Sequence, residues 1–304
     1  MSEQKSSEAP VLGGQAVVEG IMIRGLNTLT VTVKAPDSNT ITRTEVLSPI
    51  FSGSFRRIPF VRGILVLVET LTLGLKALTW SSAVAAGEVK TADEASGLTF
   101  LDWIIFLVAF GIGIGVFFAG PVIVTGWLEA TLPSWLVLLI EGALRLGLLL
   151  AYIWGIGHIS DVERMFQFHG AEHMAIAAAE SLDRLTPESV MKHSRLHPRC
   201  GTSFLLMVGL VSVVVFAFAG SEPLWWRVSS RLLLIPVVAG VAYELIRLAD
   251  RFQQFRGVRL ITAGNLNLQR LTTRPPELEH VEVAIEAVNS ALDSEKELQL
   301  GKNT

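Results

Sequence analysis

Long apolar runs constrain this chain more than any other feature of its sequence. Four runs, at about 100–126, 135–157, 203–220 and 230–249, come near or exceed the ~20 apolar residues that a helix needs to cross a bilayer core of about 30 Å. Only 17% of the 304 residues are charged, whereas a soluble domain has roughly 25%. The sequence therefore predicts a mainly α-helical, polytopic membrane protein with about four transmembrane helices.

A fifth apolar run, at 59–80, is harder to assign. It contains Arg62, Glu69 and Lys76, and each charge placed at mid-bilayer costs roughly 2.5–3.5 kcal/mol. We therefore expect an amphipathic helix that lies in the membrane interface or packs against the bundle. The alternative is a fifth span.

The distribution of basic residues favours four spans. Residues 1–99 contain nine Lys and Arg, residues 158–202 five, and residues 250–304 seven. Four spans place all three segments on one side, which the positive-inside rule identifies as cytoplasmic. The first residues lack the basic and apolar regions of a signal peptide. We expect a bacterial cytoplasmic (inner) membrane protein with both termini in the cytoplasm.

The polar segments suggest a domain order. β-Branched residues alternate on both sides of Pro36-Asp37-Ser38-Asn39, which predicts a β-hairpin between Leu29 and Leu47. After Pro275-Pro276, apolar residues recur at helical spacing and predict a soluble helix. The expected order is a disordered tail (1–10), a β-rich cap (11–57), an amphipathic helix with a linker (58–99), a transmembrane hairpin (100–157), a cytoplasmic loop (158–202), a second hairpin (203–249) and a cytoplasmic tail with a helix (250–304).

The sharpest chemical motif is His169-x-x-Glu172-His173. On a helix, the two histidines lie one turn apart on the same face, which is the spacing that two ligands of one ion need. Neutral imidazole is a common zinc ligand, and a neighbouring carboxylate can act as a general base. The order matches the inverted zincin signature. The competing interpretation is a surface helix with two solvated histidines.

A second group of polar residues precedes the third apolar run. His197 and Cys200 are separated by two residues and could place an imidazole and a thiolate on the same metal ion. Cys200 could instead be a nucleophile or a buried small side chain. Arg199 could bind a lipid phosphate or simply snorkel to the interface.

Charged residues within or beside the apolar runs are further candidates, because intramembrane charges are expensive. Glu141 and Arg145 are spaced to pair along one helix face. Glu244 is the leading carboxylate for an extra ligand, and Asp161 could support the metal ligands from a second layer. His193 and His280 are expected to be ordinary surface residues.

Five motifs occur in an order that resembles the bacterial DUF1385 family, also called the YqhQ-like family. They are Gly13–Gly20 (GGQAVVEG), Arg24-Gly25, His169–His173 (HGAEH), His197–Thr202 (HPRCGT) and Gln269–Arg274 (QRLTTR). Members of this family are membrane proteins that are usually labelled predicted metal-dependent enzymes. The resemblance supports the histidines, Glu172 and Cys200 as a site, and it adds Glu19 and Arg24 from the cap.

Three functions remain open at this point. The first is a peptidase-like zinc hydrolase at the cytoplasmic membrane surface, with Glu172 as base and a peptide or membrane protein as substrate. The second is a scaffold or assembly factor with a structural zinc site, which would be closed if both His197 and Cys200 bind. A lipid-handling or transport protein is the third. The net charge of −3 gives no case for nucleic-acid binding, and the single cysteine excludes an intramolecular disulfide.

Overall fold

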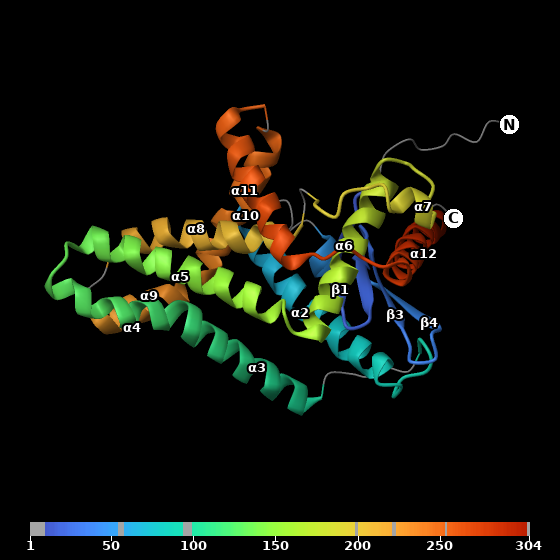
Figure 1. Cartoon of the computed structure of the whole chain (residues 1–304), viewed down its shortest axis with the longest axis horizontal. Coiled ribbons are helices and arrows are strands. Elements are labelled where there is room, and N and C mark those ends of the chain that lie inside the picture. The colour runs from blue at the N-terminus through green and yellow to red at the C-terminus, as the bar shows by residue number, and fades with distance from the viewer. Residues whose placement is uncertain are drawn as a thin grey trace.

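The computed structural model describes residues 10–53, 58–93, 99–197, 200–220, 223–252 and 254–302. The described part of the chain is mainly helical and carries a small antiparallel sheet near its N-terminus. Figure 1 shows the sheet with two long helices at one end of the molecule, and a bundle of apolar helices that extends away from it. We call the sheet and the helices that cover it the cap, and the remaining helices the bundle.

The four strands of the sheet pair in chain order with antiparallel neighbours. β3 and β4 form the hairpin that the sequence predicted, and the Ala35 amide closes its turn by donating to the Asn39 carbonyl (2.8 Å). At the β1–β2 turn a side chain on Gly20 would meet the Thr32 carbonyl at 2.2 Å, so only glycine fits there. The strands are β1 (Gly13–Val17), β2 (Gly20–Arg24), β3 (Thr28–Lys34) and β4 (Thr40–Val46).

Both faces of this sheet are covered by helices. Because successive side chains of a strand point to opposite faces, Ile21 and Ile23 pack against α6 (Ser160–Glu180) and α12 (Leu278–Lys302). Met22 and the apolar residues of β3 pack on the opposite face against α2 (Val61–Ala85). The cap therefore has three layers, with the sheet between α2 on one side and α6 and α12 on the other.

The C-terminal helix is an integral part of the cap. The sequence predicted a soluble helix after Pro275-Pro276. The apolar face of α12, including Val281 and Val288, is fully buried in the core that it shares with the sheet and α6. His280, expected at the surface, is also fully buried, with its ring 4.5 Å from that of Phe168.

Helix α2 joins the cap to the bundle. Its C-terminal half packs on the sheet, and its N-terminal half packs on α10 (Ile235–Arg251), where Gly63 lies against Gly240. Arg62 pairs there with Glu244. Of the charges that made run 59–80 hard to place, Arg62 thus serves a contact between helices, Glu69 pairs with Arg24 of β2, and Lys76 is exposed. Helix α2 is not among the candidate membrane spans of the described chain.

Within the described residues, two helical segments are long and apolar enough to cross a membrane, Phe100–Ala130 and Ser134–Ile156. A third is possible only if α9 and α10, which are bent by 47° relative to each other, form one span, and α8 is shorter. In the described part of the chain, two of the four predicted spans therefore meet the length and hydropathy that a span requires, and a third does so if α9 and α10 form one span. The remaining elements are α1 (Pro49–Ser52), α3 (Phe100–Ile114), a π-helical turn η2 (Gly115–Ala119), α4 (Gly120–Gly126), η3 (Trp127–Ala130), α5 (Ser134–Ile156), α7 (Pro187–Val190), α8 (Thr202–Ala219), α9 (Leu224–Leu233) and α11 (Arg256–Thr272).

The bundle has its polar side chains inside and its apolar side chains outside. In α9, Arg227 and Arg231 are buried, whereas Trp225 is 68% exposed and Leu233 is 69% exposed. This is the reverse of a helix on a water-soluble protein. Exposed tryptophans lie near both ends of α5, at Trp135 and Trp154, nineteen residues or about 28 Å apart at 1.5 Å per residue. Such spacing matches the two interfaces of a bilayer.

Glu295 of α12 anchors the β2–β3 turn and provides a test of the cap. Its carboxylate accepts hydrogen bonds from the amides of Asn27 (2.6 Å) and Thr28 (2.8 Å) and from both of their side chains. Burial alone would raise the pKa of Glu295, but these donors outweigh it and lower the pKa below its usual value. We expect Glu295→Gln to destabilise the cap by about 1–3 kcal/mol, seen as faster hydrogen exchange of β2 and β3 amides.

The pH dependence follows from the same carboxylate. Because its pKa is lower in the folded than in the unfolded chain, its stabilisation is complete above the unfolded value of about 4.3 and declines as the pH falls below it. The wild type should therefore lose more protection than Glu295→Gln between pH 5 and pH 3. Glu297→Gln, on the exposed side of the same helix, is the control. Equal exchange in all three proteins would contradict the assignment.

Candidate metal centre

Helix α6 provides the first two residues of the site. Its second half is rich in alanine and is buried in the cap core, and Gly170 lets it approach the Arg274 carbonyl, which a side chain would meet at 2.4 Å. His169 and His173 project from one face with ring centroids 4.4 Å apart. The helical spacing predicted from the sequence is therefore present, but on a packed helix and not on a solvated one.

Backbone carbonyls hold both imidazole rings in place. His169 Nδ1 lies 2.8 Å from the Thr272 carbonyl oxygen, and His173 Nδ1 lies 2.6 Å from that of Arg195. A carbonyl can only accept, so each neutral ring carries its proton on Nδ1 and keeps a lone pair on Nε2. This is how metal-binding histidines are usually oriented by their surroundings.

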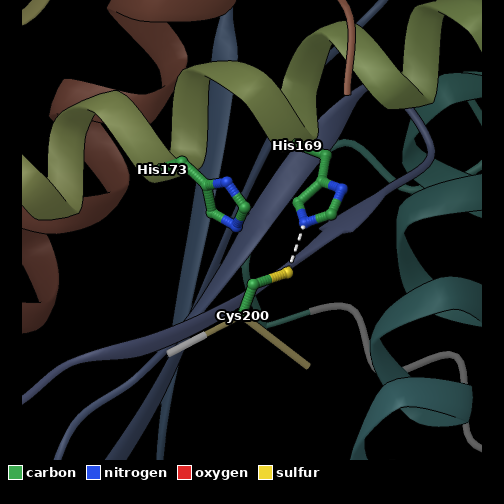
Figure 2. A group of neighbouring side chains, drawn as sticks. All are labelled: His169, His173 and Cys200. Carbon is green, nitrogen blue, oxygen red and sulfur yellow. Dashed lines mark hydrogen bonds between the residues drawn. The ribbon is translucent and has the colours of Figure 1, made fainter. Parts of the chain in front are cut away.

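The thiol of Cys200 lies close to the Nε2 atoms that carry these lone pairs. Its Sγ lies 3.2 Å from His169 Nε2 and can donate its proton to it. Figure 2 shows the two rings from α6 turned toward the cysteine, which comes from a different segment. One ligand atom from each of these three residues lies within 4.8 Å of the others. His173 Nε2 is buried and has no hydrogen-bond partner among the described residues, which leaves a lone pair directed into the cluster.

His197 lies beside this group and not within it. Its Nε2 is 3.2 Å from Glu180 Oε2, and its ring centroid is 5.8 Å from that of His173. Its backbone is held by Gln269 of α11, whose side chain accepts from the His197 amide (2.9 Å) and donates to its carbonyl (2.8 Å). Gln269 therefore fixes the backbone of His197, and the imidazole of His197 contacts Glu180 and is not part of the group of His169, His173 and Cys200.

Glu172 lies on the cap side of α6, over the backbone of β1. A side chain on Gly14 would meet Glu172 Oε1 at 2.4 Å. The carboxyl group is only 3% exposed, and its Oε2 has no partner in the described part of the chain. Burial raises the pKa of Glu172 to about 7, although the neighbouring His169 opposes the shift. The group is thus able to take up or release a proton near neutral pH.

The residues predicted to support the site lie further from it. Glu19 pairs with Arg164 of α6 and so joins the β1–β2 turn to the helix, with one contact of 2.7 Å. Arg24 donates to Glu69 of α2 (3.1 Å), and Asp161 is exposed in the first turn of α6. Arg199 lies outside the described residues.

Glu244, the leading candidate for an additional carboxylate ligand, is used elsewhere. It accepts from Arg62 Nε (2.6 Å) and from the Phe60 amide (3.0 Å) at the contact between α2 and α10. It is not part of the His and Cys group.

Several residues that build the site carry no chemical signature of their own in the sequence. The carbonyls of Arg195 and Thr272 orient the two histidines, and Gly14 makes room for Glu172. Gly14 stood in the motif Gly13–Gly20, and Gln269 and Thr272 stood in Gln269–Arg274, but the motifs did not reveal these roles. Carbonyl groups are present at every position, so no residue type could have pointed to them.

Comparison with known proteins identifies a family for this chain. Residues 58–294 match the model of a family described as "Protein of unknown function (DUF1385)". The chain belongs to the DUF1385 family. It is 35% identical over 303 residues to the "Uncharacterized protein YqhQ" of Bacillus subtilis (strain 168), with 95% of this chain and 94% of that protein covered. No solved structure gave a significant match. The family match includes the His and Cys group, whereas β1 to β4 lie before it.

The packing of Glu172 over β1 can be tested with adjacent glycines. Gly14→Ala places a methyl group against the carboxyl group and should cost about 1–3 kcal/mol, as overpacking does. Gly13→Ala is a matched control, because its methyl group would meet nothing within 4 Å. Thermal unfolding of the full chain in detergent should show a lower midpoint for Gly14→Ala only. Equal midpoints would place Glu172 elsewhere.

Proposed function

We propose that this protein is a membrane-bound, zinc-dependent hydrolase of the peptidase type, with its site on the cytoplasmic side of a bacterial inner membrane. The observation that carries the proposal is the convergence of His169 Nε2, His173 Nε2 and Cys200 Sγ. The basic residues of segments 1–99, 158–202 and 250–304 favour the cytoplasmic side by the positive-inside rule.

The donor set suits zinc. Two imidazole nitrogens and one thiolate are typical zinc ligands, and the buried lone pair of His173 would gain the partner that the described residues do not supply. Three protein ligands with a fourth position left open are characteristic of catalytic zinc, whereas structural sites are filled by four. Because His197 is engaged by Glu180, the arrangement supports the open type.

The chemistry would be divided between the ion and the protein. In such a site zinc lowers the pKa of water and polarises a carbonyl group. Glu172 would accept the proton of the attacking water and pass it to the leaving group, a role that suits a carboxyl group with a pKa of about 7. The carbonyls of Thr272 and Arg195 would keep both imidazoles oriented throughout.

A structural zinc site in a membrane scaffold is the second candidate. One feature favours a structural role. The three candidate ligands, and the carbonyl groups that orient the histidines, come from separate segments of the chain: α6, the segment before α8, and α11. A metal ion here would lock the cap to the bundle. In that case Glu172 would have no chemical role.

Metal content tests the site itself. We expect about one zinc per chain in the purified protein, and a loss of most of it in His173→Ala and in Cys200→Ser. His193→Ala is the control, because His193 contacts Asp183 (3.0 Å) and lies outside the ligand group. Elemental analysis after size-exclusion chromatography gives the ratio. A metal-free wild type, or equal zinc in all variants, would refute the site.

Glu172→Gln separates the two candidates. The substitution removes the base and should leave the ligands intact, so the variant should keep its zinc and lose at least a hundredfold in hydrolysis, within the usual range for general acid–base catalysis. The readout is a comparison of new peptide N-termini in membranes of cells that express the wild type or the variant. A metal-loaded variant that yields the same new termini and the same growth would leave only the structural role.

A further inference from the structure

The bundle contains a second polar centre, at the end opposite the cap. Glu141 of α5 is buried and accepts hydrogen bonds from Arg145 Nη2 (2.7 Å) and Arg227 Nη2 (2.8 Å). Arg231 Nε lies 3.5 Å from the same carboxylate. Figure 1 places α9, which carries two of these arginines, beside α4 and away from the sheet. The centre is thus distinct from the His and Cys group.

The charges of this centre do not balance. Three buried arginines face one buried carboxylate, and the only second acid that an ion pair brings to them within the described chain is Glu129, whose side chain is 32% exposed. One positive charge is left over even when both acids are ionised. An uncompensated charge is costly in a membrane interior, and such groups usually have a partner.

Arg231 presents the nitrogen atoms that could receive that partner. Its Nη1 donates to the Gly220 carbonyl (3.1 Å) and to Ser230 Oγ (3.1 Å). Its Nε and Nη2 are buried and make no hydrogen bond with any described residue, and of the two it is Nε that forms the ion pair with Glu141. These two nitrogens form the edge of a guanidinium group that binds two oxygens of a phosphate or carboxylate at once.

The guanidinium groups are held in fixed positions. Phe216 lies between Arg145 and Arg231, with each guanidinium carbon 5.0 Å from its ring centroid. Arg227 also donates to Thr125 Oγ1 (3.0 Å). The arrangement is therefore prepared for a ligand before it binds, which lowers the entropic cost of binding.

The centre lies a short way inside one of the two expected membrane interfaces. Trp127, Trp135 and Trp225 are exposed at this end of the bundle, as expected for the membrane interface. Glu141 follows Trp135 by six residues on α5, or about 9 Å along a helix axis. Arg227 and Arg231 follow Trp225 by less than two turns of α9.

We propose that Arg231, together with Arg145 and Arg227, binds a phosphate group at this end of the bundle. The interfacial depth fits the phosphodiester of an anionic membrane lipid, and inorganic phosphate shares the same chemistry. The bound group would supply the missing negative charge and occupy the Nε and Nη2 edge of Arg231.

The test uses the full chain, purified in an uncharged detergent and titrated separately with phosphatidylglycerol, diacylglycerol and inorganic phosphate. We expect phosphatidylglycerol to raise the thermal midpoint by several degrees and diacylglycerol, which lacks the phosphate, to have no such effect. A shift with inorganic phosphate alone would identify free phosphate as the source. No shift with either phosphate ligand, or an equal shift with diacylglycerol, would overturn the proposal.

Variants localise the effect. Arg231→Gln should lose more than half of the shift, whereas Arg251→Gln, at an exposed arginine at the end of α10, should keep it. If Arg231→Gln does not fold, Arg231→Lys preserves the charge but not the paired nitrogens, and its half-saturating ligand concentration should rise at least threefold. A full shift in Arg231→Gln, or an unchanged concentration in Arg231→Lys, would refute the role of Arg231.

Discussion

Two backbone hydrogen bonds determine what the site of this protein can bind. The carbonyls of Thr272 and Arg195 fix the protons of His169 and His173 on Nδ1 and turn both Nε2 atoms toward Cys200. Each carbonyl belongs to a segment that is remote from α6 in the sequence. The arrangement of these three side chains therefore depends on the docking of α11 and of the segment before α8 against a helix that is itself buried in the cap.

The apolar outer surface of the bundle explains why the molecule has two polar centres. Apolar side chains cover the outside of the bundle, so charged groups can be accommodated only between its helices or beyond its ends. One centre, the His and Cys group, lies where the bundle meets the cap. The other, around Glu141, lies at the far end with an excess of arginine. The centres differ in chemistry: lone pairs in the first favour a cation, and the excess of guanidinium groups in the second favours an anion.

Local sequence patterns predicted the elements better than their assembly. The hairpin between Leu29 and Leu47 was evident because turn residues and alternation act over a few positions. The role of α2 was not evident from the sequence, because the charge of Arg62 is compensated by Glu244, which lies 182 residues away in the chain. The same limitation applies to α12, where helical periodicity revealed an apolar face but not the sheet that covers it.

Residue type and spacing in the sequence were sufficient to predict the apolar helices, a β-rich cap with its β3–β4 hairpin, the position of His169 and His173 on one helix face, and the family. Periodicity and residue type carry that information locally. Only the tertiary structure decided that Cys200 joins the two histidines while His197 turns to Glu180, and that Glu172 is buried over Gly14. Those outcomes depend on contacts between segments far apart in the chain, and no local pattern specifies which segments meet.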